Sequence, residues 1–166
     1  MSGVLGLLGL FAGCGPTGSG GCEVGPNPGV AVGLSGAFGA HSWYVPPEAR
    51  DGVAGVYWYA ECGTDCTSGA YVVDVALQVW DLDVSEPLAV RITASTSDGE
   101  QVGELEAELE PACRCDLDVR EIAEQRLRFE IGLEDLEGED LVLEATVEDA
   151  SVRVVSDPVE VVADAL

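Results

Sequence analysis

Residues 101 to 110 read Gln-Val-Gly-Glu-Leu-Glu-Ala-Glu-Leu-Glu, and this stretch decides the fold. Leu105, Ala107 and Leu109 occupy every second position, and glutamates fill the positions beside them. A period of two places the apolar side chains on one face of a strand and the charged side chains on the other. The stretch therefore predicts a half-buried β-strand with an acidic outer face.

The same alternation continues through most of the chain after residue 50. It recurs at 126–133 and 141–148, and enrichment in β-branched and aromatic residues predicts further strands at 53–62, 71–81, 88–97 and 152–162. Pro158 interrupts the last of these segments, which indicates an edge strand or a bulge. Ser97-Asp98-Gly99-Glu100 predicts a hairpin turn, because Gly tolerates the positive φ of tight turns. Helical periodicity is confined to 119–126, where one or two turns are expected.

About seven or eight short antiparallel strands, with no helices to cover a parallel sheet, predict an all-β fold of two sheets packed face to face. Within residues 126–162, the strand RLRFEIGL, the corner Leu136-Glu137-Gly138, the strand DLVLEATVEDA and the return VRVVSDPVEVV are similar to the last three strands of immunoglobulin-like or fibronectin-III-like modules of bacterial surface proteins. The resemblance implies an antiparallel, immunoglobulin-like β-sandwich.

The first fourteen residues have a different character. An apolar run from Val4 ends in Leu10-Phe11-Ala12-Gly13-Cys14, which resembles the lipobox of a bacterial lipoprotein signal. The run has the length of a signal h-region and is too short to cross a bilayer core of roughly 30 Å as a helix. The resemblance implies that Cys14 carries the lipid and becomes the mature N-terminus. The alternative is a buried apolar N-terminal strand or helix.

These segments predict a three-part organisation. A signal segment at 1–14 is followed by a Gly- and Pro-rich flexible linker at 15–39 and by the β-sandwich domain at 40–166. The linker has few side chains to bury and is expected to act as a tether. The chain is accordingly expected outside the cytoplasm, anchored by its lipid to the bacterial cell envelope, with the outer membrane as the expected membrane.

The charge balance excludes several classes of partner. The net charge is −24, from 31 acidic residues against 7 basic ones, all of them arginine. A nucleic-acid backbone would be repelled, so nucleic-acid binding is not expected. Anionic headgroups would not attract this chain either, so membrane attachment has to come from the lipid. The acidity is explained by a solvated surface or by adaptation to high salt.

The row of Glu104, Glu106 and Glu108 constrains the neighbouring strand. Like charges on paired strands repel, so a partner strand that carries arginine is favoured. Arg91, Arg126 and Arg128 are the candidates for this role.

The cysteines have several open assignments. If Cys14 is acylated, Cys22, Cys62, Cys66, Cys113 and Cys115 remain. Outside the cytoplasm such residues are usually in disulfides, and we expect a Cys62–Cys66 bridge. Cross-pairing between the clusters at 62–66 and 113–115 is the next alternative, and a four-sulfur zinc or copper site is a third. Counting strand reversals places the two clusters at opposite ends of the sandwich, which argues against both alternatives.

One acidic turn is a candidate calcium site. It contains five carboxylates, from Glu134, Asp135, Glu137, Glu139 and Asp140. Carboxylate oxygens suit a hard cation, but no EF-hand spacing is present, and a solvated acidic turn explains the same residues. Apart from this calcium alternative no cofactor is expected.

Little in the chain indicates catalysis. His41 is the only histidine, and none of the common hydrolase or nucleotide-binding motifs occurs. Paired carboxylates can hydrolyse glycosides, but no acid here stands out as buried. We therefore expect a non-enzymatic, lipid-anchored envelope module that binds a protein or a glycan. The alternatives are a structural accessory domain without a ligand, a calcium-stabilised binding domain and, last, a small hydrolase.

Overall fold

β-Strands make up nearly all of the regular structure in the computed structural model, which describes residues 24–38, 41–45, 49–50, 53–61, 70–114 and 119–165. The strands are β1 (Gly29–Phe38), β2 (His41–Val45), β3 (Ala49–Arg50), β4 (Val53–Glu61), β5 (Ala70–Trp80), β6 (Leu88–Thr96), β7 (Gln101–Leu109), β8 (Ala112–Arg114), β9 (Val119–Phe129), β10 (Asp140–Glu148), β11 (Arg153–Val155) and β12 (Val159–Ala165). One helical turn, α1 (Leu133–Leu136), precedes β10. The predicted all-β fold is confirmed.

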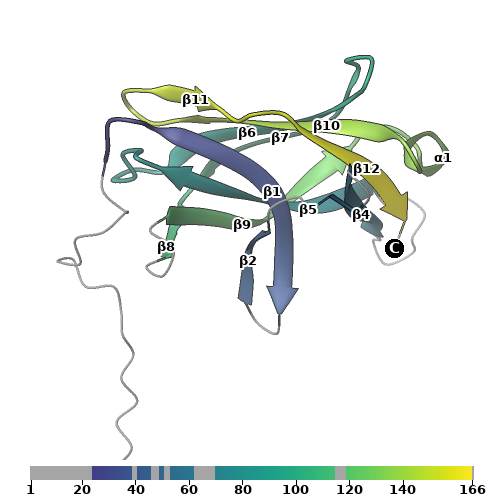
Figure 1. Ribbon diagram of the computed structural model, residues 1–166, viewed down its shortest axis with the longest axis horizontal. Helices are drawn as coiled ribbons and strands as arrows, with labels where there is room; N and C mark the ends of the chain where they lie inside the picture. Colours follow the sequence, from purple (N-terminus) through teal and green to yellow (C-terminus); the bar gives the residue numbers. More distant parts are fainter. Residues whose placement is uncertain are drawn as a thin grey trace, which may run out of the picture.

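The strand pairings form one continuous sheet. Its order is β2-β1-β5-β4-β12-β10-β6-β7-β9-β8, and β9 also pairs with β5, so the path returns to a strand that it has already passed. These pairings are antiparallel except for β4 with β12, which run parallel. The result is nearly barrel-like and flattened, with β6, β7, β10 and β11 in one layer and β5, β8 and β9 in the other (Figure 1).

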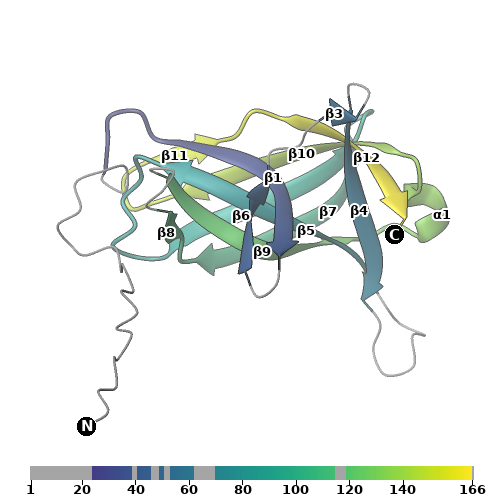
Figure 2. The ribbon, with the colours of Figure 1, turned by 60° about the horizontal axis from the view of Figure 1, so that its bottom comes forward.

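A two-sheet, immunoglobulin-like sandwich is not confirmed, because the pairing continues from one layer into the other. β12 and β4 join the layers at one side, where Figure 2 shows them next to each other. At the other side β7 joins β9 through only two residues, Gly103 and Glu104. The layers therefore belong to a single sheet that closes on itself.

Most of the strands predicted from alternation are confirmed. The segments predicted at 53–62, 88–97, 101–110 and 141–148 correspond to β4, β6, β7 and β10. The expected hairpin turn joins β6 to β7. In this turn Gly99 has a φ of 89°, and the backbone N–H of Thr96 donates to the carbonyl oxygen of Glu100 at 2.8 Å. Pro158 lies between β11 and β12, as its interruption of the last segment predicted.

Two predicted segments require correction. The helical turns expected over 119–126 are wrong, because these residues are strand β9 and pair with β5. Residues 29–38 fall in the predicted linker, yet they form β1 against β5, with Val30 and Val32 buried. Gly29 permits this pairing, since a Cβ there would lie 2.3 Å from the Trp80 ring. The strand-rich part of the chain therefore begins at Gly29 and not at residue 40.

The interior between the two layers is filled by one apolar cluster. Alternate residues of β5, β6 and β10 supply most of it, including Val73, Val75, Leu77, Val79, Leu88, Val90, Ile92, Leu141, Leu143 and Val147. Leu136 of α1 is also fully buried in this cluster. After it Gly138 turns the chain with a φ of 83° and donates its N–H to the carbonyl oxygen of Ala163 at 2.7 Å. The predicted corner at 136–138 is thus a tight connection into β10.

The outward sides of the two layers differ. The covered face consists of the outward side chains of β5 and β9, namely Val72, Ala76, Gln78 and Glu121. Val72 and Ala76 are fully buried although they lie outside the core cluster, and β2 lies against both β5 and β9. The exposed face consists of the outward side chains of β7, β6, β10 and β11. It is the face on which strand alternation leaves charged side chains in solvent.

Candidate functional site

The exposed face is ordered by strand register. Arg91 of β6 lies opposite Glu106 of β7, and Ala89 lies opposite Glu108. On the other side of β6, Arg91 lies opposite Thr146 of β10. Because outward residues recur at every second position, register places these side chains in rows across the strands.

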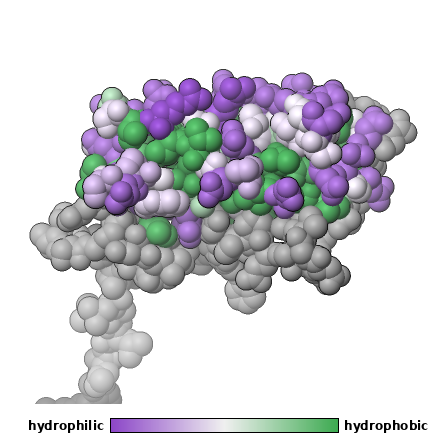
Figure 3. Space-filling view, turned by 45° about the horizontal axis from the view of Figure 1, so that its top comes forward, coloured by the Kyte–Doolittle hydropathy of each residue, from purple (hydrophilic) through white to green (hydrophobic). Residues whose placement is uncertain are grey.

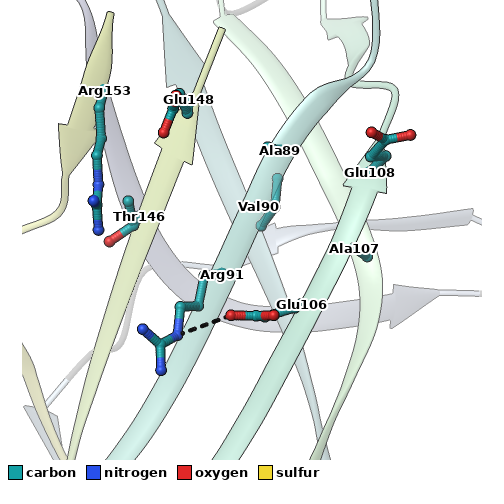
Figure 4. Close-up of a pocket in the computed structure, with 9 residues that line it drawn as sticks. All are labelled: Ala89, Val90, Arg91, Glu106, Ala107, Glu108, Thr146, Glu148 and Arg153. Carbon is teal, nitrogen blue, oxygen red and sulfur yellow. Dashed lines mark ion pairs between the residues drawn. The ribbon is translucent and has the colours of Figure 1, made fainter.

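A hollow of about 560 Å³ lies on this face, and we call it the charged hollow. Its lining comes from β6, β7, β10 and β11, and consists of Ala89, Val90, Arg91, Glu106, Ala107, Glu108, Thr146, Glu148 and Arg153. Figure 4 shows Arg153 and Glu148 at one side of it and Glu106 and Glu108 at the other, with the small side chain of Ala89 between them. Small residues on β6 and β10 thus leave a depression with charges of both signs around it.

Arg91 is held in place by two glutamates. Its Nε lies 3.4 Å from Oε1 of Glu106, the ion pair drawn in Figure 4, and it also donates to a carboxylate oxygen of Glu104. Glu104 in turn accepts a hydrogen bond of 3.1 Å from the side-chain amide of Gln101. The Arg91 and Glu106 side chains are 45% and 69% exposed, so each pair stabilises the fold by less than about 1 kcal/mol. Their main effect is to orient the floor of the hollow.

Arg153 differs from Arg91, because it forms no ion pair with any residue that the structure describes. It lies opposite Glu148 in the pairing of β11 with β10, and its side chain is exposed. Val155, two residues further along the same strand, is 53% exposed. The rim formed by β11 therefore presents one cation and one apolar side chain that are available to a partner.

The predicted role of the arginines is confirmed for two of the three. Arg91 lies opposite Glu106, and Arg128 lies opposite Glu104 in the short pairing of β9 with β7. Arg126 instead faces β5, where its Nε lies 3.8 Å from Oδ1 of Asp74. The glutamate row thus has arginine-bearing strands on both sides, as like-charge repulsion requires.

Asp149 shapes the connection from β10 into β11 and so positions Arg153. Its carboxylate accepts hydrogen bonds from the backbone N–H groups of Ser151 and Val152, both at 2.7 Å, and from that of Asp83 at 2.9 Å. Desolvation by itself would raise the pKa of Asp149, but these bonds and a further one from the Ser151 hydroxyl lower it to about 2. The carboxylate consequently stays charged and ties this connection to the one that follows β5.

Figure 3 shows the upper side of the molecule in a space-filling view. Hydrophobic residues lie there in separate patches between hydrophilic ones. Such a mixed surface is typical of non-obligate interaction sites, which differ little from the remaining surface in overall polarity.

Most of the predicted cysteine and lipid sites lie outside the described residues. This applies to Cys14, Cys22, Cys62, Cys66 and Cys115. The backbone of Cys113 belongs to β8, where it pairs with Arg120 of β9. The expected Cys62–Cys66 bridge and its alternatives therefore stay predictions.

The five carboxylates of the calcium hypothesis run from α1 through the corner to the start of β10. In the part of the chain that the structure describes, no three side chains of His, Cys, Asp or Glu are grouped as a metal site. His41 lies at the start of β2, and Trp80, at the end of β5, is 36% exposed. The structure thus draws attention away from these residues and towards the charged hollow.

Sequence reasoning missed four lining residues: Ala89, Thr146, Glu148 and Arg153. Alternation in β6 and β10 was the signal that they point outward. What it could not provide is the pairing of β10 with both β6 and β11, which brings segments distant in the sequence into one surface.

No family of known proteins, no curated protein and no solved structure matches this chain. In addition, none of the helices described here is long and apolar enough to cross a membrane.

Proposed function

We propose that the chain is a non-catalytic, lipid-anchored module of the bacterial cell envelope that binds another protein through its exposed face. The observation that carries the binding role is the charged hollow, where the uncompensated Arg153 and the exposed Val155 lie beside a row of glutamates. Charged groups and a polar rim of this kind provide orientation and selectivity in protein recognition.

A protein partner fits the hollow better than a glycan does. None of the described residues that line the hollow is aromatic, so a sugar ring would find no flat apolar surface there. Charges of both signs, in contrast, match the mixed charges found on protein surfaces.

The anchoring part of the proposal rests on the sequence Leu10-Phe11-Ala12-Gly13-Cys14 and on the start of the first long strand at Gly29. Residues 15–28 would then join the lipid to the folded module. With a net charge of −24, attachment would depend on the acyl chains and not on anionic headgroups. We also propose that the two layers of Figure 1 correspond to the two sheets of an immunoglobulin-like module whose edges have become paired.

The anchor is tested by the mass of the mature chain after expression in a bacterial host. The expected result is an acylated N-terminus at Cys14 in the membrane fraction, and its loss in a Cys14→Ala variant. An unmodified chain that begins at Met1 in the soluble fraction would contradict the proposal.

The binding role is tested by photo-crosslinking in intact envelopes. A photoreactive amino acid at Ala89 reports on the hollow, and the same group at Glu137, an exposed residue of the corner after α1, is the matched control. We expect a discrete adduct from position 89 that weakens with Arg153→Glu, and none from position 137. Identical adducts from both positions, or none from position 89, would refute the role of this face.

A further inference from the structure

The closed sheet is split between β7 and β9. β7 pairs with β6 along its whole length, but on its other side only Gly103 and Glu104 pair with β9. Beyond the split, β8 pairs with the opposite end of β9 through Ala112, Cys113 and Arg114. Between these two contacts no strand pairing joins residues 105–111 to residues 122–127. We call this interval the split.

The split has an identifiable physical cause. Continuing the register of Gly103 with Phe129 along both strands would place Glu108 opposite Glu124, and these like charges would repel each other. Glu124 also has a φ of 58°, at a bulge where β9 loses register with β5. The close contact at Gly103 depends on glycine, because a Cβ there would lie 2.8 Å from the carbonyl oxygen of Arg128. The sheet therefore closes at this glycine and opens beyond it.

The open side of β7 has two chemically distinct rows. Leu105 and Leu109 are partly buried and pack against the core, whereas Glu106 and Glu108 are exposed. A hollow of about 200 Å³ lies within the split, with Leu109 and Ile122 among its lining residues. A strand beside β7 would thus have its inward side chains next to apolar groups and its outward side chains next to carboxylates.

We infer that this edge of β7 binds an extended segment of a partner protein whose residues alternate between apolar and basic. Strand addition to an open edge is an established mode of peptide recognition, in which alternate side chains determine specificity. The chain shows the same chemistry where the edge is already occupied, because Arg128 of β9 lies opposite Glu104 while the adjacent Phe129 is buried.

A second copy of this chain fits the edge poorly. Pairing two copies of β7 would align the row of Glu106 and Glu108 with another row of glutamates, and charged edges of this kind disfavour self-association. The inference concerns a different site from the charged hollow, so either can fail without the other.

Peptide binding to the purified full chain tests the inference. The probe is a nine-residue peptide of alternating Val and Lys, measured by calorimetry at low salt. The controls are a peptide of the same composition with the two residue types in separate blocks and a peptide of alternating Val and Glu. We expect binding of the alternating Val/Lys peptide only, with slower hydrogen exchange of the amides of residues 105–109.

Matched charge reversals locate the site. Glu106→Arg with Glu108→Arg is expected to weaken Val/Lys peptide binding by about tenfold or more, the effect of turning two attractive cross-strand pairs into repulsive ones. Glu144→Arg with Glu148→Arg changes the net charge equally on β10 and is expected to alter affinity by no more than about twofold. Equal effects of the two double variants, equal binding of the block peptide, or no binding would overturn the inference. So would protection of residues 105–109 by dimerisation without peptide.

Discussion

The exposed face and the covered face are outward sides of the same closed sheet, yet they obey opposite rules. On the exposed face, carboxylates and arginines alternate in solvent, and the ion pair of Arg91 with Glu106 is typical. On the covered face, Val72 and Ala76 are fully buried, and even the carboxylate-bearing Glu121 is only 5% exposed. The outward side of a strand is therefore not by itself a surface, because a distant hairpin can cover it.

The same side-chain type has a different consequence on each face. Glu121 accepts a hydrogen bond of 3.2 Å from the side-chain amide of Gln78, in surroundings from which water is largely excluded. Glu106 forms its ion pair in water, where screening reduces its value. Mutations at corresponding positions of the two faces should therefore differ in energy more than their chemistry suggests.

The largest difference is expected for matched alanine substitutions. Ala76→Gln on the covered face places an amide in a fully buried site and should lower the free energy of unfolding by about 3 kcal/mol. Ala89→Gln on the exposed face should change it by less than about 0.5 kcal/mol. Urea unfolding of both variants measures the difference, and equal effects would show that the outward side of β5 is not covered.

Removing one carboxylate from each face should give a smaller contrast. Glu121→Ala leaves the Gln78 amide without this acceptor and is expected to cost about 2 kcal/mol. The exposed counterpart, Glu106→Ala, is expected to cost less than about 0.5 kcal/mol. Thermal unfolding at neutral pH reports both values. A Glu121→Ala variant as stable as Glu106→Ala would mean that Glu121 is effectively solvated.

Asp149 connects the two layers and makes their packing sensitive to acid. Its pKa of about 2 lies below the ordinary value of 3.8, so its contribution is present above pH 4 and is lost as the pH falls towards 2. Asp149→Asn should reduce stability by about 1 kcal/mol at neutral pH. The variant should also flatten the fall in melting temperature between pH 4 and pH 2. An unchanged acid profile would contradict the assignment.

The smallest effect is expected for the charges of the exposed face. Arg91→Gln should lower stability by less than about 1 kcal/mol at low salt, and the loss should disappear near 1 M salt, where the Debye length is about 3 Å. Arg153→Gln is the control, because Arg153 has no ion pair among the described residues. If the two variants show the same salt dependence, general charge and not pairing accounts for it.

Local patterns predicted the strands well where one side of the strand meets water. The alternation around Leu105 and Leu143 identified β7 and β10 and the direction in which their glutamates point. The turn at Gly99 was equally predictable, since its φ is set by the hairpin. The predicted partnership of the glutamates with Arg91 and Arg128 also followed from charge alone.

Prediction failed where a segment depends on distant partners. Val119–Arg126 has helical spacing of its apolar residues, but pairing with β5 makes it a strand. Gly29–Phe38 has the composition of a linker, and it becomes β1 because Val30 and Val32 find the core beside β5. In both segments tertiary pairing overrides the local preference.

The amino-acid order alone determined that this chain is all-β, acidic and built of strands with alternating sides, because these properties depend on neighbours only one or two residues away. Tertiary structure decided which strands meet, that the sheet closes on itself and then splits beside Glu106 and Glu108, and which outward side is covered. Those outcomes depend on register between segments far apart in the chain, and a shift of one residue reverses the side to which every side chain points.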